Sequence, residues 1–395
     1  MNSMTLTPRE SGEFIAQAAD HVKINQESIN RTAEQVSVLK RNGVQEKIIS
    51  VVTFHIHSQI VELLQSNSLS ISGITQSEIH PKTPNEEALN WIFLVDTLNF
   101  CFWTQNGDHW SVTWKGKKYT GYFALCAAVN RALEEGYSIT NPKYYSQISL
   151  RDLKTILRGD NKLVSVQLLN KRLDCLHEVG LTLLERFDGK FLNCVSACNG
   201  SAEKLLKIIV ENFPCYKDET HYKGQKVSLY KRAQILIGDI WICFKGQNEG
   251  HFNDIDKLTM FADYRVPQVL VHFNIFRYSD DLMEKLKKGL YLQFHFSLVL
   301  QFYLHCHFST GVLLDSGSPE EVEIRGCSIH AVELLNKKIK QLKNNIVSNV
   351  NQNNSSENSI ICNSILIDHY LWDYRRQHAS ELESIPFHRT LSIFY

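Results

Sequence analysis

Amphipathic helical patterns recur along this chain and constrain its fold more than any other feature. In many segments apolar residues return every three or four positions, which is the spacing of one helix face. These segments are Gly121–Gly136, Ser149–Arg158, Ser201–Phe213, Leu229–Ile242, Pro267–Phe276, Asp280–Lys288 and Ser328–Leu342. A further helix is expected after Thr7, because Thr7-Pro-Arg-Glu-Ser11 has the pattern of an N-terminal cap. The sequence therefore predicts a mainly α protein.

One segment is typical of β structure instead. Residues alternate on both sides of a Lys-Gly-Lys turn in Trp110–Gly121, which predicts a small β-hairpin. The chain shows no internal repeat, no glycine-rich phosphate loop and no dinucleotide-binding fingerprint. With 395 residues it is long enough to bury a large core. We expect a single domain, residues 1–395, built as one or two lobes.

Three segments differ from a compact helical core. The Asn/Ser tract at 344–358 predicts a flexible loop. Lys47–Leu69 is apolar and weakly periodic. Leu290–Leu314 has no charged residue, and its length would permit a membrane span. Its glutamines and histidines are costly in hydrocarbon, so we interpret both 47–69 and 290–314 as atypical insertions and expect no membrane anchor.

The charge balance favours a small substrate. Lys+Arg and Asp+Glu are 42 each, so the formal net charge is zero. Proteins that hold long polyanions usually carry a basic excess, because neutralising phosphates drives that binding. DNA or intact tRNA is therefore the less favoured partner.

The ten cysteines are scattered singly and predict no zinc site. Cys194 and Cys198 form a lone pair, and His305-Cys306-His307 a lone cluster, so neither supplies four ligands at a recognised spacing. Reduced thiols in a cytosolic protein are the better interpretation. No apolar run follows the first residues, so no secretory signal is expected.

Four short segments combine aromatic and charged residues more densely than a plain helical bundle needs. They are Asp96–Trp103, Ser228–Leu236, Leu258–Leu270 and Asp368–Tyr374. Each segment alone is weak evidence for a functional site, because such residues often form satisfied structural hydrogen bonds. Together they favour a shared pocket, since buried charges need partners.

Asp263 lies at the centre of the third of these segments. Pro267 suits the first position of a helix and pushes Val266 toward extended geometry, so Asp263 is expected on the turn before that helix. A fixed carboxylate beside Phe261 suits gripping a flat ring and stabilising positive charge next to it. From these residues alone, a capping Asp with a packed Phe is the stronger interpretation.

Long strings in the chain resemble the queuosine salvage family, the queuosine 5′-phosphate N-glycosylases. They are Pro8–Ser11, Asp96–Trp103, Gly121–Gly136, Tyr230–Leu236, Leu258–Leu270, Tyr278–Asp281, Glu321–Cys327, Leu371–Tyr374 and Pro386–Arg389. The resemblance fails over 47–69 and 290–314, which are either true insertions or intron sequence read into the chain. It implies a helical architecture related to helix-hairpin-helix DNA glycosylases.

The resemblance also implies two catalytic residues. Asp263 matches the carboxylate that stabilises or attacks the sugar carbon. Lys231 matches a lysine that donates to the base, orients Asp263 or meets the 5′-phosphate; a salt-bridged structural lysine is the alternative.

The remaining implied site residues would bind the substrate. Phe261 matches the ring that stacks on the base, and His80 matches a base-contacting histidine, although a loop histidine before proline is often only exposed. Asp368 and Asp373 match two recognition carboxylates, one for a guanine-type edge and one for the secondary amine of queuine, in an order left open. His369 departs from the family pattern, in which the matching position carries Tyr.

The implied activity is hydrolysis of the N-glycosidic bond of queuosine 5′-monophosphate, which releases queuine for salvage into tRNA modification. No metal or cofactor, no direct polynucleotide partner and no membrane is expected, and the location is cytoplasmic with the nucleus left open. The alternative is a non-catalytic nucleoside- or tRNA-binding relative that has lost turnover. A DNA-repair glycosylase is a further rival, disfavoured by the neutral net charge.

Overall fold

Helices make up most of the described chain, as the amphipathic patterns predict. The computed structural model describes residues 4–30, 78–104, 109–288, 313–350 and 363–395. Its main helices are α1 (Pro8–Ala18), α5 (Glu86–Thr97), α6 (Gly121–Glu134), α7 (Pro142–Tyr145), α8 (Leu150–Ile156), α9 (Leu169–Arg186), α10 (Phe191–Ala197), α11 (Ala202–Asn212), α12 (Lys231–Cys243), α13 (Val266–His272), α15 (Pro319–Val350) and α16 (Ser364–Gln377). Residues 280–288 are also helical. The mainly α fold is confirmed, while its relation to helix-hairpin-helix glycosylases stays a prediction.

The strands of the described chain form small antiparallel pairs. They are β1 (Val22–Ile24) with β6 (Phe276–Tyr278), β2 (Ser111–Trp114) with β3 (Lys117–Thr120), and β4 (Glu219–Tyr222) with β5 (Gln225–Ser228). The hairpin predicted from Trp110–Gly121 is therefore confirmed. Its turn residues Lys115 and Gly116 have φ of 49° and 76°, the positive values that a two-residue hairpin turn requires.

One predicted helix is too long. The pattern over Pro267–Phe276 predicts a single helix, but α13 ends at His272. Asn274 then adopts a left-handed conformation with φ of 54°, and the chain continues into β6. There Phe276 pairs with Ile24 of β1, so a long-range strand pairing overrides the local apolar periodicity.

Local side-chain caps explain where several helices begin. Thr7 and Glu10 form a reciprocal capping box at the start of α1, as the sequence predicts. Ser149 accepts a hydrogen bond from the Asp152 backbone N–H at 3.1 Å, and Ser201 caps α11 in the same way. These contacts satisfy backbone donors that no helical carbonyl can reach.

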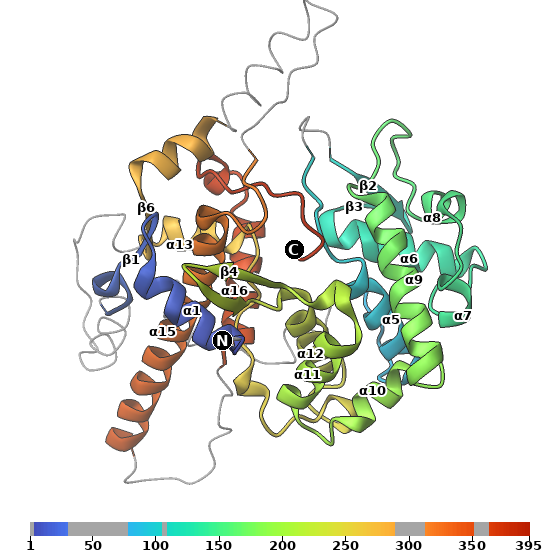
Figure 1. Cartoon of the computed structure of the whole chain (residues 1–395), viewed down its shortest axis with the longest axis horizontal. Coiled ribbons are helices and arrows are strands. Elements are labelled where there is room, and N and C mark those ends of the chain that lie inside the picture. Colours follow the sequence, from blue (N-terminus) through green and yellow to red (C-terminus); the bar gives the residue numbers. More distant parts are fainter. Residues whose placement is uncertain (1–3, 31–77, 105–108, 289–312, 351–362) are drawn as a thin grey trace, which may run out of the picture.

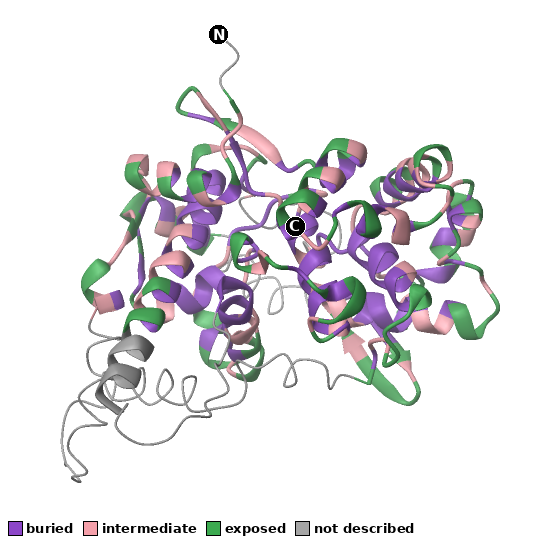
Figure 2. Cartoon of the chain, turned by 90° about the horizontal axis from the view of Figure 1, so that it is seen from below, coloured by how far each residue is buried: buried purple, intermediate pink, exposed green. Residues whose placement is uncertain are grey.

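The helices gather into two groups. Figure 1 shows α1, α13, α15 and α16 on one side of the molecule, and α5 to α9 with the β2–β3 hairpin on the other. α12 packs against α5, and α13 packs against α16. Buried residues lie along the inner faces of both groups, and exposed residues on their outer surfaces (Figure 2). The four aromatic and charged segments are thus carried by elements that face the middle of the molecule.

A close contact joins the first helix to the longest one. α1 packs along α15, and a Cβ atom added at Gly326 would lie 2.5 Å from Cδ1 of Ile15. No side chain other than hydrogen fits at Gly326, so glycine there allows the two helix backbones to approach.

Some predicted segments lie outside the described residues. This holds for 47–69 and for 290–312. α15 continues to Val350 and so includes the first part of the 344–358 tract, because Asn and Ser disfavour a helix only mildly. Residues 351–358 lie outside the described residues. In the described ranges, no helix is both long and apolar enough to cross a membrane.

Candidate active site

The segment leading to Asp263 is fixed from two directions. The Phe261 backbone N–H donates to Oδ1 of Asp368 at 3.2 Å. The next residue, Ala262, accepts a hydrogen bond at its carbonyl from Nε of Arg325, also at 3.2 Å. These partners come from α16 and α15, so two helices distant in sequence hold Phe261 and Ala262 in place.

Asp263 itself is buried at the start of α13. Its Oδ1 accepts hydrogen bonds from the backbone N–H groups of Arg265 at 2.9 Å and Val266 at 2.8 Å. The capping role considered from the sequence is therefore real, but it uses only this oxygen. Oδ2 has no hydrogen-bond donor among the described residues. Burial raises the pKa of Asp263, and the charge of Lys231 opposes that rise.

Lys231 begins α12 and faces two carboxylates. Its backbone N–H donates to Oδ2 of Asp218 at 3.2 Å, which anchors the helix start. Burial lowers the pKa of the Lys231 ammonium, and the charges of Asp263 and Asp368 raise it. No ion pair to Lys231 exists in the described part of the chain, so its ammonium is near both carboxylates without being committed to either.

The neighbouring Arg232 has a structural task. Its guanidinium donates to the carbonyl of Thr97 at 2.5 Å and to that of Cys215, and it lies over the rings of Phe100 and Tyr216. These contacts tie α12 to the end of α5. Arg232 is therefore occupied within the core, whereas Lys231 faces the carboxylates.

Phe261 presents its ring between α12 and α16. A Cβ atom added at Gly238 would lie 2.9 Å from Cζ of Phe261, so the ring rests directly on the α12 backbone. The imidazole of His369 meets the ring edge-on, with centroids 5.9 Å apart and planes at 89°. Because Gly238 has no side chain, the Phe261 ring can lie directly against α12. The imidazole of His369 then limits movement of the ring toward α16.

The charge of Asp263 acts on a second buried carboxylate of the candidate site, Asp368. Burial raises the pKa of Asp368 well above its ordinary value, and the negative charge of Asp263 raises it further. The charge of Lys231 and the Phe261 N–H oppose this rise. Two carboxylates, Asp263 and Asp368, therefore lie near the ammonium of Lys231 in this part of the site.

His80 is part of the same interior and is not an exposed loop residue. Its Nε2 lies 3.2 Å from the Tyr122 hydroxyl, and its ring stacks near Phe123 with centroids 6.1 Å apart. Burial lowers the pKa of His80 to about 4. Burial likewise lowers the pKa of His369 to about 4, and His80 contributes to that shift. Both imidazoles are therefore neutral near pH 7, and Nε2 of His369 is buried without a partner among the described residues.

Asp373 lies apart from this group. Its side chain is 53% exposed and stands 3.9 Å from Nη1 of Arg376. Five residues along a helix correspond to a rotation of about 140°, so Asp373 and Asp368 leave α16 on different faces. Arg376 in turn lies over the ring of Phe123, which stacks on His80. Asp373 is thus at the margin of the group, and its role in recognition stays a prediction.

The structure adds Asp239 and Tyr122, which the sequence did not single out. Burial raises the pKa of Asp239 to about 7, and the Tyr122 hydroxyl lowers it. The Asp239 charge also raises the pKa of the buried Asp96, whose Oδ2 has no partner among the described residues. A lone Asp in the apolar run Ile235–Cys243 was an available signal for this second acidic pair. Tyr122 gave none, because it follows the amphipathic pattern of α6.

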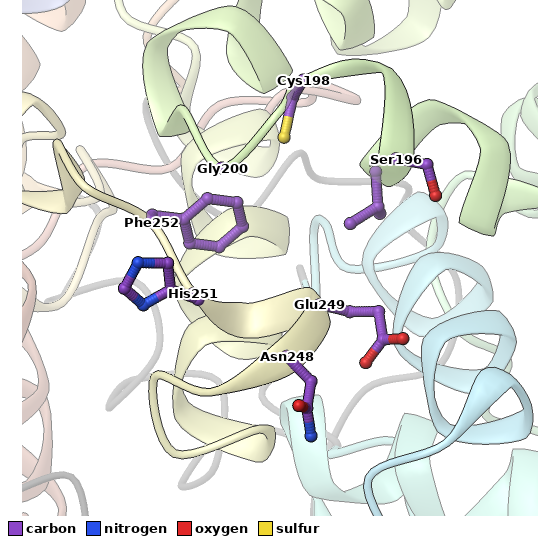
Figure 3. A pocket seen from close by; sticks show the side chains of 8 residues that line it. Ser196, Cys198, Gly200, Asn248, Glu249, His251 and Phe252 are labelled. Atoms are coloured by element: carbon purple, nitrogen blue, oxygen red, sulfur yellow. The ribbon is translucent and has the colours of Figure 1, made fainter.

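A separate cavity of about 240 Å³ lies near α10 and η3 (Asn248–Gly250). Its lining includes Val195, Ser196, Cys198, Gly200, Asn248, Glu249, His251 and Phe252. Figure 3 shows these side chains around it. None of the predicted site residues lines this cavity. Cys194 and Cys198 nearby are free thiols, and the described residues contain no cluster of metal-ligating side chains.

Comparison with known proteins decides the family. The family profile described as queuosine salvage protein matches residues 79–295 and 291–395. The chain belongs to this family. Among queuosine salvage relatives, the bovine protein is 41% identical over 391 residues, covering 99% of both chains. The mouse protein is 40% identical over 392 residues, again covering 99% of both.

A bacterial relative from Sphaerobacter thermophilus is 34% identical over 318 residues, covering 80% of this chain and 84% of its own. All three relatives carry the name queuosine 5′-phosphate N-glycosylase/hydrolase. The two matched parts of the queuosine salvage profile meet at 291–295, within the predicted 290–314 insertion. The resemblance read from the sequence strings is thereby confirmed.

Proposed function

We propose that this protein hydrolyses the N-glycosidic bond of queuosine 5′-monophosphate and releases queuine. The observation that carries the proposal is the buried carboxylate of Asp263. One of its oxygens is fixed by two backbone N–H groups, and the other has no donor in the described chain. An aromatic ring, Phe261, lies two residues away and is held against Gly238. The names of the relatives support this substrate.

The chemistry requires negative charge beside the sugar. As the C1′–N bond breaks, its electron pair leaves with the base and C1′ becomes cationic. The free oxygen of Asp263 would stabilise that cation or bond to it, and water would then supply the hydroxyl group of ribose 5-phosphate. The base takes up one proton. Queuine is a 7-deazaguanine with carbon at position 7, so the usual purine protonation site is missing and more of the barrier falls to Asp263.

Lys231 supports this step through its charge. It lies near both Asp263 and Asp368 and lowers the pKa of each carboxyl. Keeping Asp263 ionised in a buried site is the role that best fits this position. A direct hydrogen bond from the ammonium to the departing base is compatible with the same arrangement.

Different residues would recognise the two parts of queuine, its heterocycle and its cyclopentenediol arm. Phe261 would stack on the heterocycle, and the buried Asp368 next to it would accept N–H bonds from its guanine-type edge. Asp373, which is half exposed, suits the secondary amine of the cyclopentenediol arm, because that end of queuine is charged and hydrated. His80 and His369 are neutral donors or acceptors for the remaining polar atoms.

A product assay tests the proposal. The purified full chain is incubated with queuosine 5′-monophosphate, and queuine and ribose 5-phosphate are quantified by mass spectrometry. We expect both products in equal amounts. Binding of the nucleotide without any queuine would favour the non-catalytic alternative. Damaged duplex DNA serves as a second substrate, and base release from it would instead support the DNA-repair alternative.

The cellular setting follows from the same proposal. A free base released from a nucleotide can be reused for tRNA modification without this protein touching tRNA. The buried free cysteines fit a reducing compartment such as the cytosol.

A further inference from the structure

Two guanidinium groups converge beside Asp263. Oε1 of Gln268 accepts a hydrogen bond from Nη1 of Arg265 at 3.2 Å and another from Nε of Arg375 at 3.1 Å. Gln268 is buried, and its Nε2 donates to the carbonyls of Leu382 at 3.2 Å and Ile385 at 2.5 Å. One fixed amide oxygen therefore holds a residue before α13 and a residue of α16 together.

These two charges lack an ion-pair partner. In the described ranges, no carboxylate lies within ion-pair distance of Arg265 or Arg375. Asp263 and Glu383 act on Arg375 only at longer range. The pKa of Arg265 is lowered to about 10, chiefly by burial; the charges of Arg375 and Arg389 also lower it, whereas Tyr264 and Asp263 raise it. Collecting like charges in a partly buried place is unfavourable unless an anion joins them.

The geometry of Arg265 is suited to binding an anion. Its guanidinium carbon Cζ lies over the Phe387 ring, 3.8 Å from the ring centroid, and 5.6 Å from the centroid of the Tyr264 ring. Stacking of this kind fixes the plane and leaves the edge donors available. Nε and Nη2 of Arg265, and both Nη atoms of Arg375, make no hydrogen bond within the described chain. Both residues are partly exposed, so a ligand can reach them.

The pair lies next to the groups proposed to act on the sugar and the base. The Arg265 backbone N–H donates to Oδ1 of Asp263, the same carboxylate proposed to face C1′. Arg375 follows Asp368 by seven residues on α16, which is about two helical turns, so the two share one face. The unused donors are thus close to a ribose whose C1′ is at Asp263.

We infer that Arg265 and Arg375 form an anion subsite that binds the 5′-phosphate of the substrate. The inference rests on the proposed function for the identity of the ligand. Planar guanidinium groups bind phosphate oxygens through paired N–H donors. This fits two arginines that meet with no carboxylate within ion-pair distance among the described residues. Lys231 is then left to its electrostatic role between Asp263 and Asp368.

Comparing nucleotide with nucleoside tests this subsite. We measure kcat/KM for queuosine 5′-monophosphate and for queuosine, which lacks the phosphate, in the wild type and in Arg265→Gln and Arg375→Gln. We expect each variant to lose about 10- to 100-fold with the nucleotide, the range for hydrogen bonds to a charged group. With queuosine we expect a change of less than about twofold. Arg277→Gln, which removes an exposed charge on β6, is the matched control and should leave both values unchanged.

Equal losses with both substrates would overturn the inference, because they would mean a structural role for the arginines. No loss with either would overturn it as well. Should the wild type cleave neither substrate, the proposed function fails, and calorimetry with ribose 5-phosphate decides the subsite separately. If the wild type binds ribose 5-phosphate and Arg375→Gln does not, the subsite is supported. If the wild type does not bind it, or if the two proteins bind it equally, the subsite is refuted.

Discussion

At the scale of single residues, the candidate site depends on how two oxygens of one carboxylate are used. Oδ1 of Asp263 accepts hydrogen bonds from backbone N–H groups at the start of α13, whereas Oδ2 has no donor in the described chain. A structural cap and a reactive group are therefore combined in the same side chain. Capping and catalysis, which the sequence presented as alternative roles for Asp263, are therefore compatible.

Replacing Asp263 by asparagine separates these two uses. Asp263→Asn keeps a side-chain oxygen for the two N–H groups but removes the negative charge. We expect queuine release to fall by at least about 10²–10³-fold, the loss typical of removing an electrostatic stabiliser. Binding of the nucleotide, measured by calorimetry, should persist. Full activity in a folded Asp263→Asn protein would exclude Asp263 from catalysis.

The pH dependence of the reaction should reflect the same residue. Because burial raises the pKa of Asp263 above 3.8, kcat/KM should fall as the pH drops through that raised value. Lys231→Gln removes the positive charge that lowers this pKa. The acid limb of the profile should therefore move to higher pH in the variant.

The control for this shift is Lys204→Gln, which removes an exposed lysine of α11. Its acid limb should coincide with that of the wild type. If the limb of Lys231→Gln also stayed in place, Lys231 would not be electrostatically coupled to Asp263 in the free enzyme.

At the scale of elements, the candidate site depends on how closely α12 approaches the Phe261 segment. Gly238→Ala would place a methyl carbon only 2.9 Å from Cζ of Phe261, closer than two such carbons can pack. The ring must shift, and its stacking on the base should weaken, so we expect KM for the nucleotide to rise about 10-fold. The thermal unfolding midpoint verifies that the variant is folded. A KM equal to that of the wild type would remove Phe261 from base recognition.

Local elements were predictable from the sequence where short-range chemistry decides them. The capping box of Thr7 and Glu10 and the Lys115-Gly116 turn depend on residues a few positions apart. The end of α13 was not predictable, because the pairing of β6 with β1 depends on residues far away in the chain.

The identity of the site residues could be predicted from the family resemblance, but their arrangement in space could not. Asp263, Lys231, Phe261 and Asp368 lie together, but no local pattern states that they meet. Asp373 was expected beside them and is half exposed, since a helix separates positions five apart.

At the scale of the whole molecule, one arginine of α15 binds separate segments that carry the candidate site. Arg325 of α15 donates to both oxygens of Asp218, at 3.1 Å and 2.5 Å, and to Glu321 at 3.2 Å. It also holds the carbonyl of Ala262, next to Asp263. Asp218 in turn accepts from the backbone N–H of Lys231. The two catalytic candidates are thus positioned by a common buried network.

Breaking this network should be costly for stability. Arg325→Met leaves Asp218 and Glu321 buried without their cation, and we expect the free energy of unfolding to fall by about 3–5 kcal/mol. Urea denaturation measures the change, with Arg277→Gln as a control that should differ by less than about 0.5 kcal/mol. A loss near the control value would show that the ion pairs do not support the fold.

The packing of α1 along α15 has a consequence for biosynthesis. At about 5–20 residues per second, a ribosome needs roughly 15–60 s to make the chain that separates the two helices. During that time the face of α1 that packs on α15, which includes Ile15, lacks its α15 partner. Newly made protein should therefore depend on chaperones that shield its N-terminal region, and expression at lower temperature should improve the recovery of native protein.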